Sequence, residues 1–146
     1  MQSPDQFDAA ARRFNLLPGL VPAVLYQRGV QLRNLLRSQV LDACDRYDVL
    51  VSPYQAAPPP RIQDTKKPLA SKEQALDEIR NFSFSNAAPF AGIPAISVPC
   101  GFTQDGLPIG LQIMAKRFDE EAVFRAAYAY EQGTQWHTMR PPVGDE

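Results

Sequence analysis

The 146-residue sequence has few of the residues that build metal and redox sites. It holds two cysteines, Cys44 and Cys100, and one histidine, His137. The cysteines form no CxxC pair, and the three residues lack the close spacing of zinc ligands. We therefore expect no metal site, no redox centre and no cofactor.

Excess charge and long apolar runs are also lacking. Fifteen basic and sixteen acidic side chains leave a formal net charge of −1, whereas proteins that bind nucleic acid or anionic membranes usually show a basic face. The apolar runs are far shorter than the roughly 20 residues needed to cross a bilayer. The first residues, with Asp5 and Asp8, have no apolar signal-peptide core. These absences predict a cytoplasmic protein with no nucleic-acid and no membrane partner.

Proline, by contrast, is abundant and punctuates the predicted elements of the first half. There are 14 prolines, about twice the usual share of roughly 5%. Residues 1–19 read as a polar lead-in, and the 3.6-residue period over 21–47 predicts a long amphipathic helix. Residues 48–53 are a short apolar run ended by proline, which is typical of a strand buried on both faces of a parallel sheet. Ser71 is placed as the N-cap of a short helix over 71–80.

The loop before that helix contains three consecutive prolines, residues 58–60. Proline fixes φ and removes a hydrogen-bond donor, so a rigid extended loop is the favoured interpretation. A ligand for an aromatic groove in another domain is the alternative.

The second half predicts a short helix, a hairpin and a closing helix. The short helix ends at Gly92 and is followed by a strand over 95–99. An Asp-Gly turn at Asp105 and Gly106 then leads to a second strand over 109–113, and the two strands make a β-hairpin.

Asp119 is predicted to cap a final helix of about fourteen residues, with Phe118 and Val123 as a hydrophobic staple. We place His137 near the end of that helix. Gly110, inside the second hairpin strand, is expected to permit the close approach of another backbone or side chain. These elements give an α/β fold whose sheet is covered by helices, with fewer strands than such a sheet requires.

A nucleophile with an activating base is not evident from the sequence. There is no G-x-S-x-G, no Gly-Gly pair, no Ser-Ser pair and no phosphate-binding loop. Ser97 is expected to be structural because it lies inside a strand, and Cys100 to be a small buried apolar group, with no basic neighbour to lower its pKa. No catalytic residue is assigned.

Residues 91–102, AGIPAISVPCGF, and 105–113, DGLPIGLQI, resemble the C-terminal signature of the amidase signature family. The resemblance extends to residues 47–53 and 118–142 and covers roughly 21–143. It implies part of a mixed β-sheet flanked by helices, an amidase-like sandwich that is incomplete in this chain. Residues 20–146 would then be the C-terminal part of an amidase-like domain, about the last third of the family's fold.

The family cleaves amides with a serine, a second serine in a cis peptide and a lysine, none of which has a counterpart in this sequence. The lysines do not lie in the family's lysine motif. The resemblance therefore implies a C-terminal fragment or subunit of an amidase, which hydrolyses a small carboxylic amide to acid and ammonia through a serine acyl-enzyme and is inactive alone. Its partner would be the upstream catalytic portion of an amidase, or the chain itself as an oligomer.

Phe82, Ser85 and Phe90 are the candidate substrate-binding residues. Phe82 aligns with an aspartate that binds the substrate ammonium in the A subunit of the glutamine-dependent tRNA amidotransferases, and Pro89 aligns with a usual asparagine. Because phenylalanine cannot pair with a charge, the resemblance favours a small uncharged amide. Aromatic packing into the core is the alternative role for the phenylalanines.

Three other functions stay open at this point. The chain is a non-catalytic interaction module that binds a partner through its open sheet edge, a truncated product of the family, or part of the A subunit of a glutamine-dependent tRNA amidotransferase.

Overall fold

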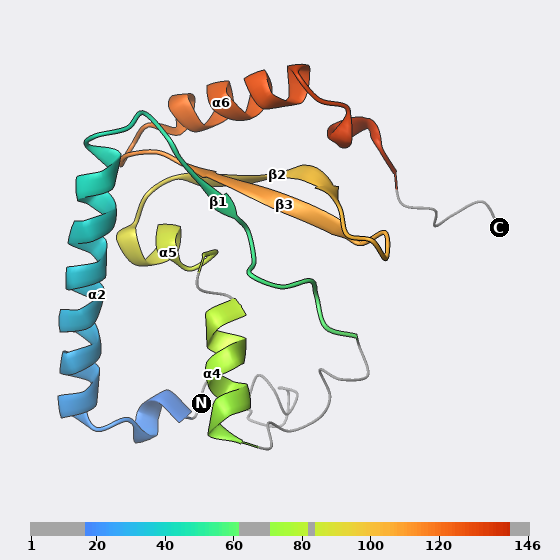
Figure 1. The fold of residues 1–146 in the computed structure, drawn as a ribbon. Helices are drawn as coiled ribbons and strands as arrows, with labels where there is room; N and C mark the ends of the chain where they lie inside the picture. Colours follow the sequence, from blue (N-terminus) through green and yellow to red (C-terminus); the bar gives the residue numbers. More distant parts are fainter. Residues whose placement is uncertain (1–16, 62–70, 82–83, 141–146) are drawn as a thin grey trace, which may run out of the picture. The chain divides into compact units, whose positions relative to one another are not determined.

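The computed structural model describes residues 17–61, 71–81 and 84–140 (Figure 1). The chain divides into two units, residues 1–35 and 36–146, each of which is taken by itself. None of the helices in the described ranges is both long enough and apolar enough to span a membrane. The elements run in the order η2 (Leu17–Leu20), α2 (Ala23–Cys44), β1 (Leu50–Pro53), α4 (Lys72–Asn81), α5 (Ala87–Ala91), β2 (Ala95–Phe102), β3 (Pro108–Met114), α6 (Glu120–Gln132) and η3 (Trp136–Thr138).

The first unit holds η2 and the first turns of α2. Pro22 sets the start of α2, since its carbonyl accepts from the backbone N–H groups of Leu25 and Tyr26 at 2.9 and 3.1 Å. The predicted long helix is confirmed, but its apolar stripe is not buried, and Leu25 and Leu32 are 56% and 61% exposed. Most of the polar lead-in, residues 1–16, lies outside the described residues.

The second unit is built on a three-stranded sheet of order β1-β3-β2. Both pairings are antiparallel, with Val51 opposite Ile113 and Ile96 opposite the same Ile113 from the other side. The expected parallel pairing of residues 48–53 is therefore wrong, and so is burial on both faces, because β1 is an edge strand in which Val51 is 62% exposed. An apolar run reports a preference for burial and carries no information on strand direction.

The hairpin between β2 and β3 is confirmed. Gly106 has φ 79°, and Thr103 and Leu107 close the turn with a backbone hydrogen bond of 2.8 Å. The strand that was expected to stop at Pro99 continues to Phe102. A register shift between Pro99 and Gly101 places a bulge there, and a bulge lets a proline sit within a strand.

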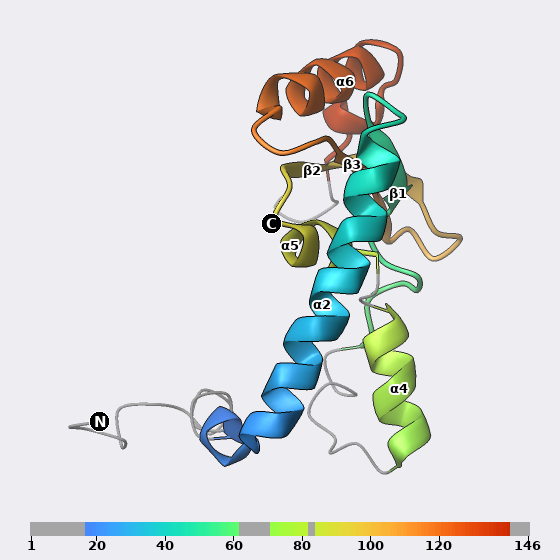
Figure 2. The same cartoon turned by 90° about the vertical axis from the view of Figure 1, so that its left-hand side faces the viewer.

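Helices lie on both faces of this sheet, as the α/β prediction required (Figures 1 and 2). On one face, Val98 and Ile113 pack against Ala127 of α6. On the other face, Met114 packs with Ala91 of α5 and Cys44 at the end of α2. The core is thus a fragment of an α/β/α sandwich.

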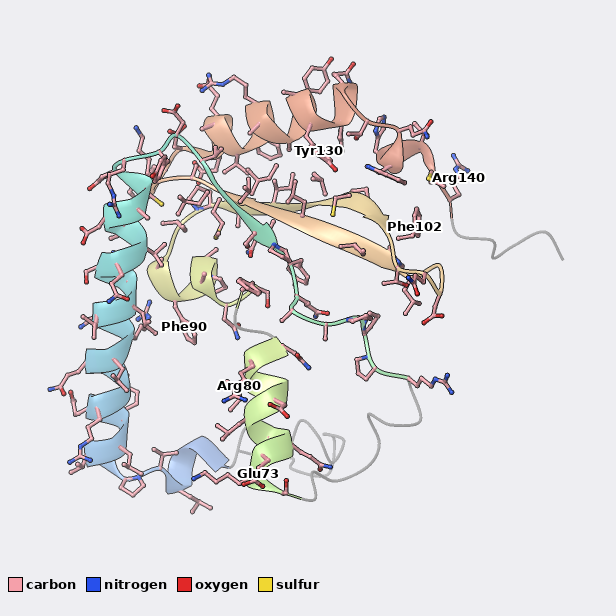
Figure 3. All side chains as sticks on the ribbon, viewed as in Figure 1. Glu73, Arg80, Phe90, Phe102, Tyr130 and Arg140 are labelled. Carbon is pink, nitrogen blue, oxygen red and sulfur yellow. The ribbon has the colours of Figure 1, made fainter. Side chains whose placement is uncertain are left out.

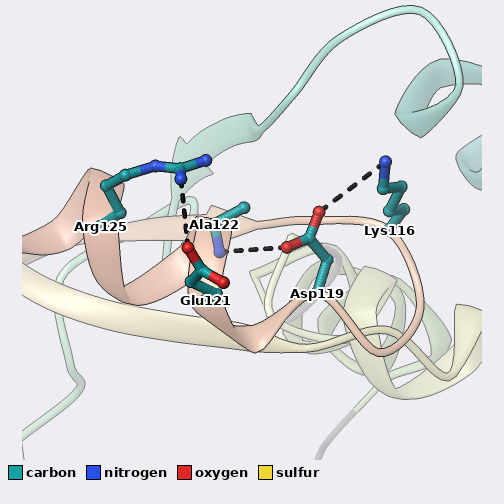
Figure 4. A network of polar contacts seen from close by, with 5 residues as sticks. All are labelled: Lys116, Asp119, Glu121, Ala122 and Arg125. Atoms are coloured by element: carbon teal, nitrogen blue, oxygen red, sulfur yellow. Dashed lines mark hydrogen bonds and ion pairs between the residues drawn. The ribbon is translucent and has the colours of Figure 1, made fainter.

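The N-terminus of α6 is fixed by polar contacts of its first turn (Figure 4). The Asp119 carboxylate accepts from the backbone N–H of Ala122 at 3.2 Å, which confirms the predicted cap. Lys116 lies 3.8 Å from the same carboxylate. One turn on, Arg125 pairs with Glu121 at 3.3 Å.

Two predictions around α6 are wrong. Phe118 is 84% exposed, so it does not form a hydrophobic staple with Val123, which packs with Ala115 and Ala122 instead. Phe118 has φ 64°, a left-handed backbone conformation that the chain adopts in the turn before the helix. His137 does not belong to α6 either, since α6 ends at Gln132 and the histidine is exposed in η3.

Candidate functional site

The candidate site is an apolar pocket of about 280 Å³ within the second unit. Its volume is just below the 300–1,000 Å³ typical of small-molecule sites. Residues of α5, of α4, of the turn before α5 and of the last turns of α2 line it: Leu36, Val40, Ile79, Asn86, Ala87, Phe90 and Ala91. Asn86 supplies the one polar side chain of this lining, so the pocket suits an apolar group with a single hydrogen-bonding partner.

The sequence of α5 explains how Phe90 reaches the pocket. Ala88 and Ala91 are 3% and 0% exposed, so these small residues seat one side of the helix against the core. Phe90 is 47% exposed and projects from α5 away from the sheet (Figure 3). Gly92, with φ 69° and ψ 48°, ends the helix as predicted, and its N–H donates to the Ala88 carbonyl at 2.8 Å.

The three predicted substrate-binding residues have different places. Phe90 lines the pocket. Ser85 is half-buried in the turn before α5 and is not part of the lining, and Phe82 lies outside the described residues. Their role in binding a substrate therefore stays a prediction.

Sequence reasoning did not assign the other pocket residues. Leu36 and Val40 are four residues apart and belong to the predicted apolar stripe of α2, which gave a signal for packing but none for a pocket. Ile79 was predicted to lie on the helix over 71–80, without a role in a pocket. Nothing in the sequence indicated a role for Asn86, which directly precedes the short helix α5. Their convergence depends on how α4 and α5 fold back toward α2.

The two thiols are poor nucleophile candidates. Burial raises the pKa of the Cys44 thiol, and the neighbouring Asp45 carboxylate raises it further. Burial also raises the pKa of the Cys100 thiol. Since the thiolate is the reactive form, a raised pKa leaves less of it at neutral pH and disfavours both groups as nucleophiles. Among the residues that the structure describes, no cluster of three or more His, Cys, Asp or Glu side chains is arranged to hold a metal ion.

A second hollow, of about 300 Å³, lies at the N-terminal end of β3. Residues 54–59, which include the first two prolines of the 58–60 run, form its other side. Gly110 lies on its wall, and the predicted close approach at this glycine is confirmed. A Cβ on Gly110 would be 2.7 Å from the Ser97 Oγ and 3.2 Å from the Tyr54 Cβ. The Ser97 Oγ thus lies beside β3 at this glycine, but the Ser97 side chain is exposed, and its structural role stays a prediction.

The segments that form β2, β3 and α5 are also where the sequence matches known proteins. The model of the family described as Amidase matches residues 7–124. The chain belongs to the Amidase family. Its expected membership is therefore confirmed, and the residues 91–102 and 105–113 that carried the resemblance form the end of α5, β2 and β3 of this amidase segment.

Curated relatives and a solved structure agree with this assignment. The chain is 40% identical over 116 residues to the A subunit of glutamyl-tRNA(Gln) amidotransferase from Thermodesulfovibrio yellowstonii, covering 80% of this chain and 23% of the relative. It is 44% identical over 120 residues to the same subunit of Methanosarcina barkeri, with the same two coverages. A bacterial aryl acylamidase structure matches 92% of this chain and 29% of that chain with a TM-score of 0.72 and 24% identity, which is a likeness of fold.

The amidase segment therefore spans about a quarter of the proteins that it resembles. The prediction that the amidase-like sandwich is incomplete in this chain is confirmed. The three antiparallel strands and their helices superpose on only one part of a larger amidase fold.

Proposed function

We propose that this chain is the C-terminal part of an amidase that hydrolyses a small uncharged carboxylic amide to acid and ammonia. The serine nucleophile, the second serine and the lysine belong to the part of the domain that this chain does not span. The serine Oγ forms an ester bond to the amide carbon, the C–N bond breaks, and the leaving nitrogen takes the hydroxyl proton and departs as ammonia. Water then cleaves the ester, which releases the acid and restores the serine hydroxyl. The observation that carries the proposal is the match over residues 7–124 to a family of which the chain covers only a fraction.

In this proposal the pocket beside α5 receives the apolar part of the substrate. Its lining contains no charged side chain, and transfer of an unpaired charge into such a site is costly. Phe90 would then contact the acyl group directly. We further propose that the enzyme acts in the cytoplasm, in keeping with its nearly balanced charges.

A second candidate is glutamine hydrolysis as part of the A subunit of a tRNA amidotransferase. This candidate is favoured by the two relatives described above, which are A subunits of glutamyl-tRNA(Gln) amidotransferase and share 40% and 44% sequence identity with this chain. It is disfavoured by Phe82 at the position where the resemblance expects an aspartate for the substrate ammonium.

The test begins with the species that contains this chain, purified from its source. The proposal expects a mass well above 16.2 kDa or a longer polypeptide, with ammonia released from neutral amides faster than from glutamine. A lone 16.2 kDa monomer without a catalytic serine and lysine would contradict it, and faster turnover of glutamine would favour the second candidate.

The role of the pocket needs a separate readout. Phe90→Ala should raise KM for an apolar amide by about tenfold, which corresponds to about 1.4 kcal/mol of lost binding. Phe124→Ala is the matched control, because Phe124 is a 64% exposed phenylalanine on α6 and lies outside this pocket. If Phe90→Ala lowers stability while KM stays unchanged, Phe90 only packs and the substrate binds elsewhere.

A further inference from the structure

Asn86 occupies the position of a helix cap but does not act as one. Asparagine is among the residues most favoured directly before a helix, where its side-chain oxygen accepts a hydrogen bond from the first turn. Asn86 immediately precedes α5, yet its side chain makes no such bond. Its backbone has the helical values φ −81° and ψ −13°, whereas a capping residue normally has an extended backbone. Capping therefore does not account for this side chain.

The Asn86 side chain lies instead on the wall of the apolar pocket beside α5, where it is half-buried. The floor of this pocket is buried, since Ala91 is 0% exposed and both Val40 and Ala87 pack against the same core cluster. The rim is apolar and between 47% and 64% exposed, and consists of Leu36, Ile79 and Phe90. A group that fills the pocket is thus surrounded by carbon atoms except where it meets Asn86.

This arrangement favours a particular kind of occupant. The Asn86 carboxamide offers two N–H donors and one carbonyl acceptor. A purely apolar group in the pocket would displace water from these atoms and leave them unpaired, which is unfavourable. A group that carries its own hydroxyl would replace the water with a hydrogen bond. The pocket therefore suits an apolar chain with one polar atom at its end.

The same lining disfavours a charged end. It contains no charged side chain, and the carboxamide of Asn86 is neutral, so an ammonium or a carboxylate in the pocket would lose water without gaining a counter-charge. Free glutamine carries both of these charges at the end opposite its side-chain amide. The polar end of the substrate should therefore be uncharged.

We infer that Asn86 is a specificity-determining residue, which selects amides whose acyl chain ends in one uncharged hydrogen-bonding group, such as a hydroxyl. The inference rests on the proposed function. The acyl chain contacts Phe90 at the rim and Ala91 at the floor, and the terminal hydroxyl bonds to the Asn86 carboxamide. Asn86 thus selects against the unsubstituted chain, because that chain leaves the carboxamide unpaired.

Pairs of isosteric substrates test this inference on the complete amidase from the source organism. Unbranched amides of increasing length are compared with ω-hydroxy amides, in which a hydroxyl replaces the terminal methyl group. At the chain length that reaches Asn86, kcat/KM should be about tenfold higher for the hydroxy amide than for its methyl isostere.

Two variants of Asn86 change this preference in different directions. Asn86→Leu keeps the size of the side chain and removes its polar atoms, so it should reverse the preference in favour of the methyl isostere. Asn86→Asp places a carboxylate in the pocket and should make the ω-amino amide, as its ammonium, about tenfold better than the hydroxy amide. Asn81→Leu is the matched control, because Asn81 is also half-buried but lies at the end of α4, outside the lining. It should keep the wild-type ratio.

The outcomes separate this inference from the proposed function. If Asn86→Leu leaves the ratio of the two kcat/KM values at the wild-type value while amides are still hydrolysed, the inference is overturned and the proposed function stands. A lower Tm of Asn86→Leu at that unchanged ratio would show that the side chain bonds to its own protein instead of to substrate. If no species that contains this chain hydrolyses an amide, the proposed function fails and the inference falls with it.

Discussion

Replacing Gly110 by alanine tests how closely Ser97 and Tyr54 approach β3. The added Cβ would lie 2.7 Å from the Ser97 Oγ and 3.2 Å from the Tyr54 Cβ. The Ser97 hydroxyl can rotate about χ1 and so relieve the first contact. The Tyr54 Cβ is fixed to a backbone whose N–H donates to the Gly110 carbonyl at 2.8 Å, so the second contact is relieved only by moving that segment away from β3.

The expected cost follows from that difference. Overpacking a well-packed site by one methyl typically costs 1–3 kcal/mol. Since one of the two close contacts can rotate away, we expect Gly110→Ala to lower the free energy of unfolding by about 1–2 kcal/mol. The Ser97→Ala background should reduce that cost by about 0.5 kcal/mol, because the hydroxyl no longer has to move.

Urea denaturation of the 146-residue chain, followed by circular dichroism, measures these differences. Gly29→Ala is the matched control, since nothing lies within 4 Å of a Cβ at this position in α2. It should stabilise the chain by up to about 1 kcal/mol through helix propensity. If Gly110→Ala is as favourable as Gly29→Ala at an unchanged m-value, the close approach of Tyr54 to β3 does not exist and the reasoning is refuted.

Three further predictions concern the two helix caps and the thiol of Cys44. Asp119→Ala removes the α6 cap and should cost about 1 kcal/mol of unfolding free energy, whereas Glu121→Ala, at an 85% exposed side chain, should cost less than about 0.5 kcal/mol; equal costs would refute the capping role. A hydrogen bond from its own backbone, and then one from Ser71, hold the pKa of the Glu73 carboxyl below its ordinary value, so the stabilisation is present above that ordinary value and is lost as the pH falls through the lowered one. Ser71→Ala should raise that pKa partway in an NMR titration, and no change would show that the hydroxyl is not involved. Cys44, whose pKa is raised by burial, should react with iodoacetamide at pH 7 at least about tenfold more slowly than free cysteine, and reaction at the free rate would contradict its burial.

The pocket was only partly accessible to sequence reasoning. Phe90 was named because aromatic residues suit an apolar site, and it does line the pocket. Asn86 and Ile79 were not named, since nothing in the local sequence shows that α4 and α5 approach the end of α2. Such convergence depends on packing between residues more than forty positions apart, such as Val40 and Ala87, which pack against the same apolar cluster.

The sequence by itself determined the features that depend on neighbouring residues. Caps at Ser71 and Asp119, the helix stop at Gly92 and the turn at Gly106 were all predicted correctly, because each depends on one side chain or one backbone conformation within a few residues. The family signature was equally local, since it lies in the consecutive residues of β2 and β3.

Only the tertiary structure decided how these elements pair and what they leave exposed. The direction of β1 and its place at the edge of the sheet depend on β3, which is some sixty residues away. The exposure of Phe118 depends on a turn conformation that hydrophobicity does not encode. Hydrophobic patterning tells which residues prefer burial, but the burial of Val51 requires a partner surface, and within the described chain that surface is not supplied.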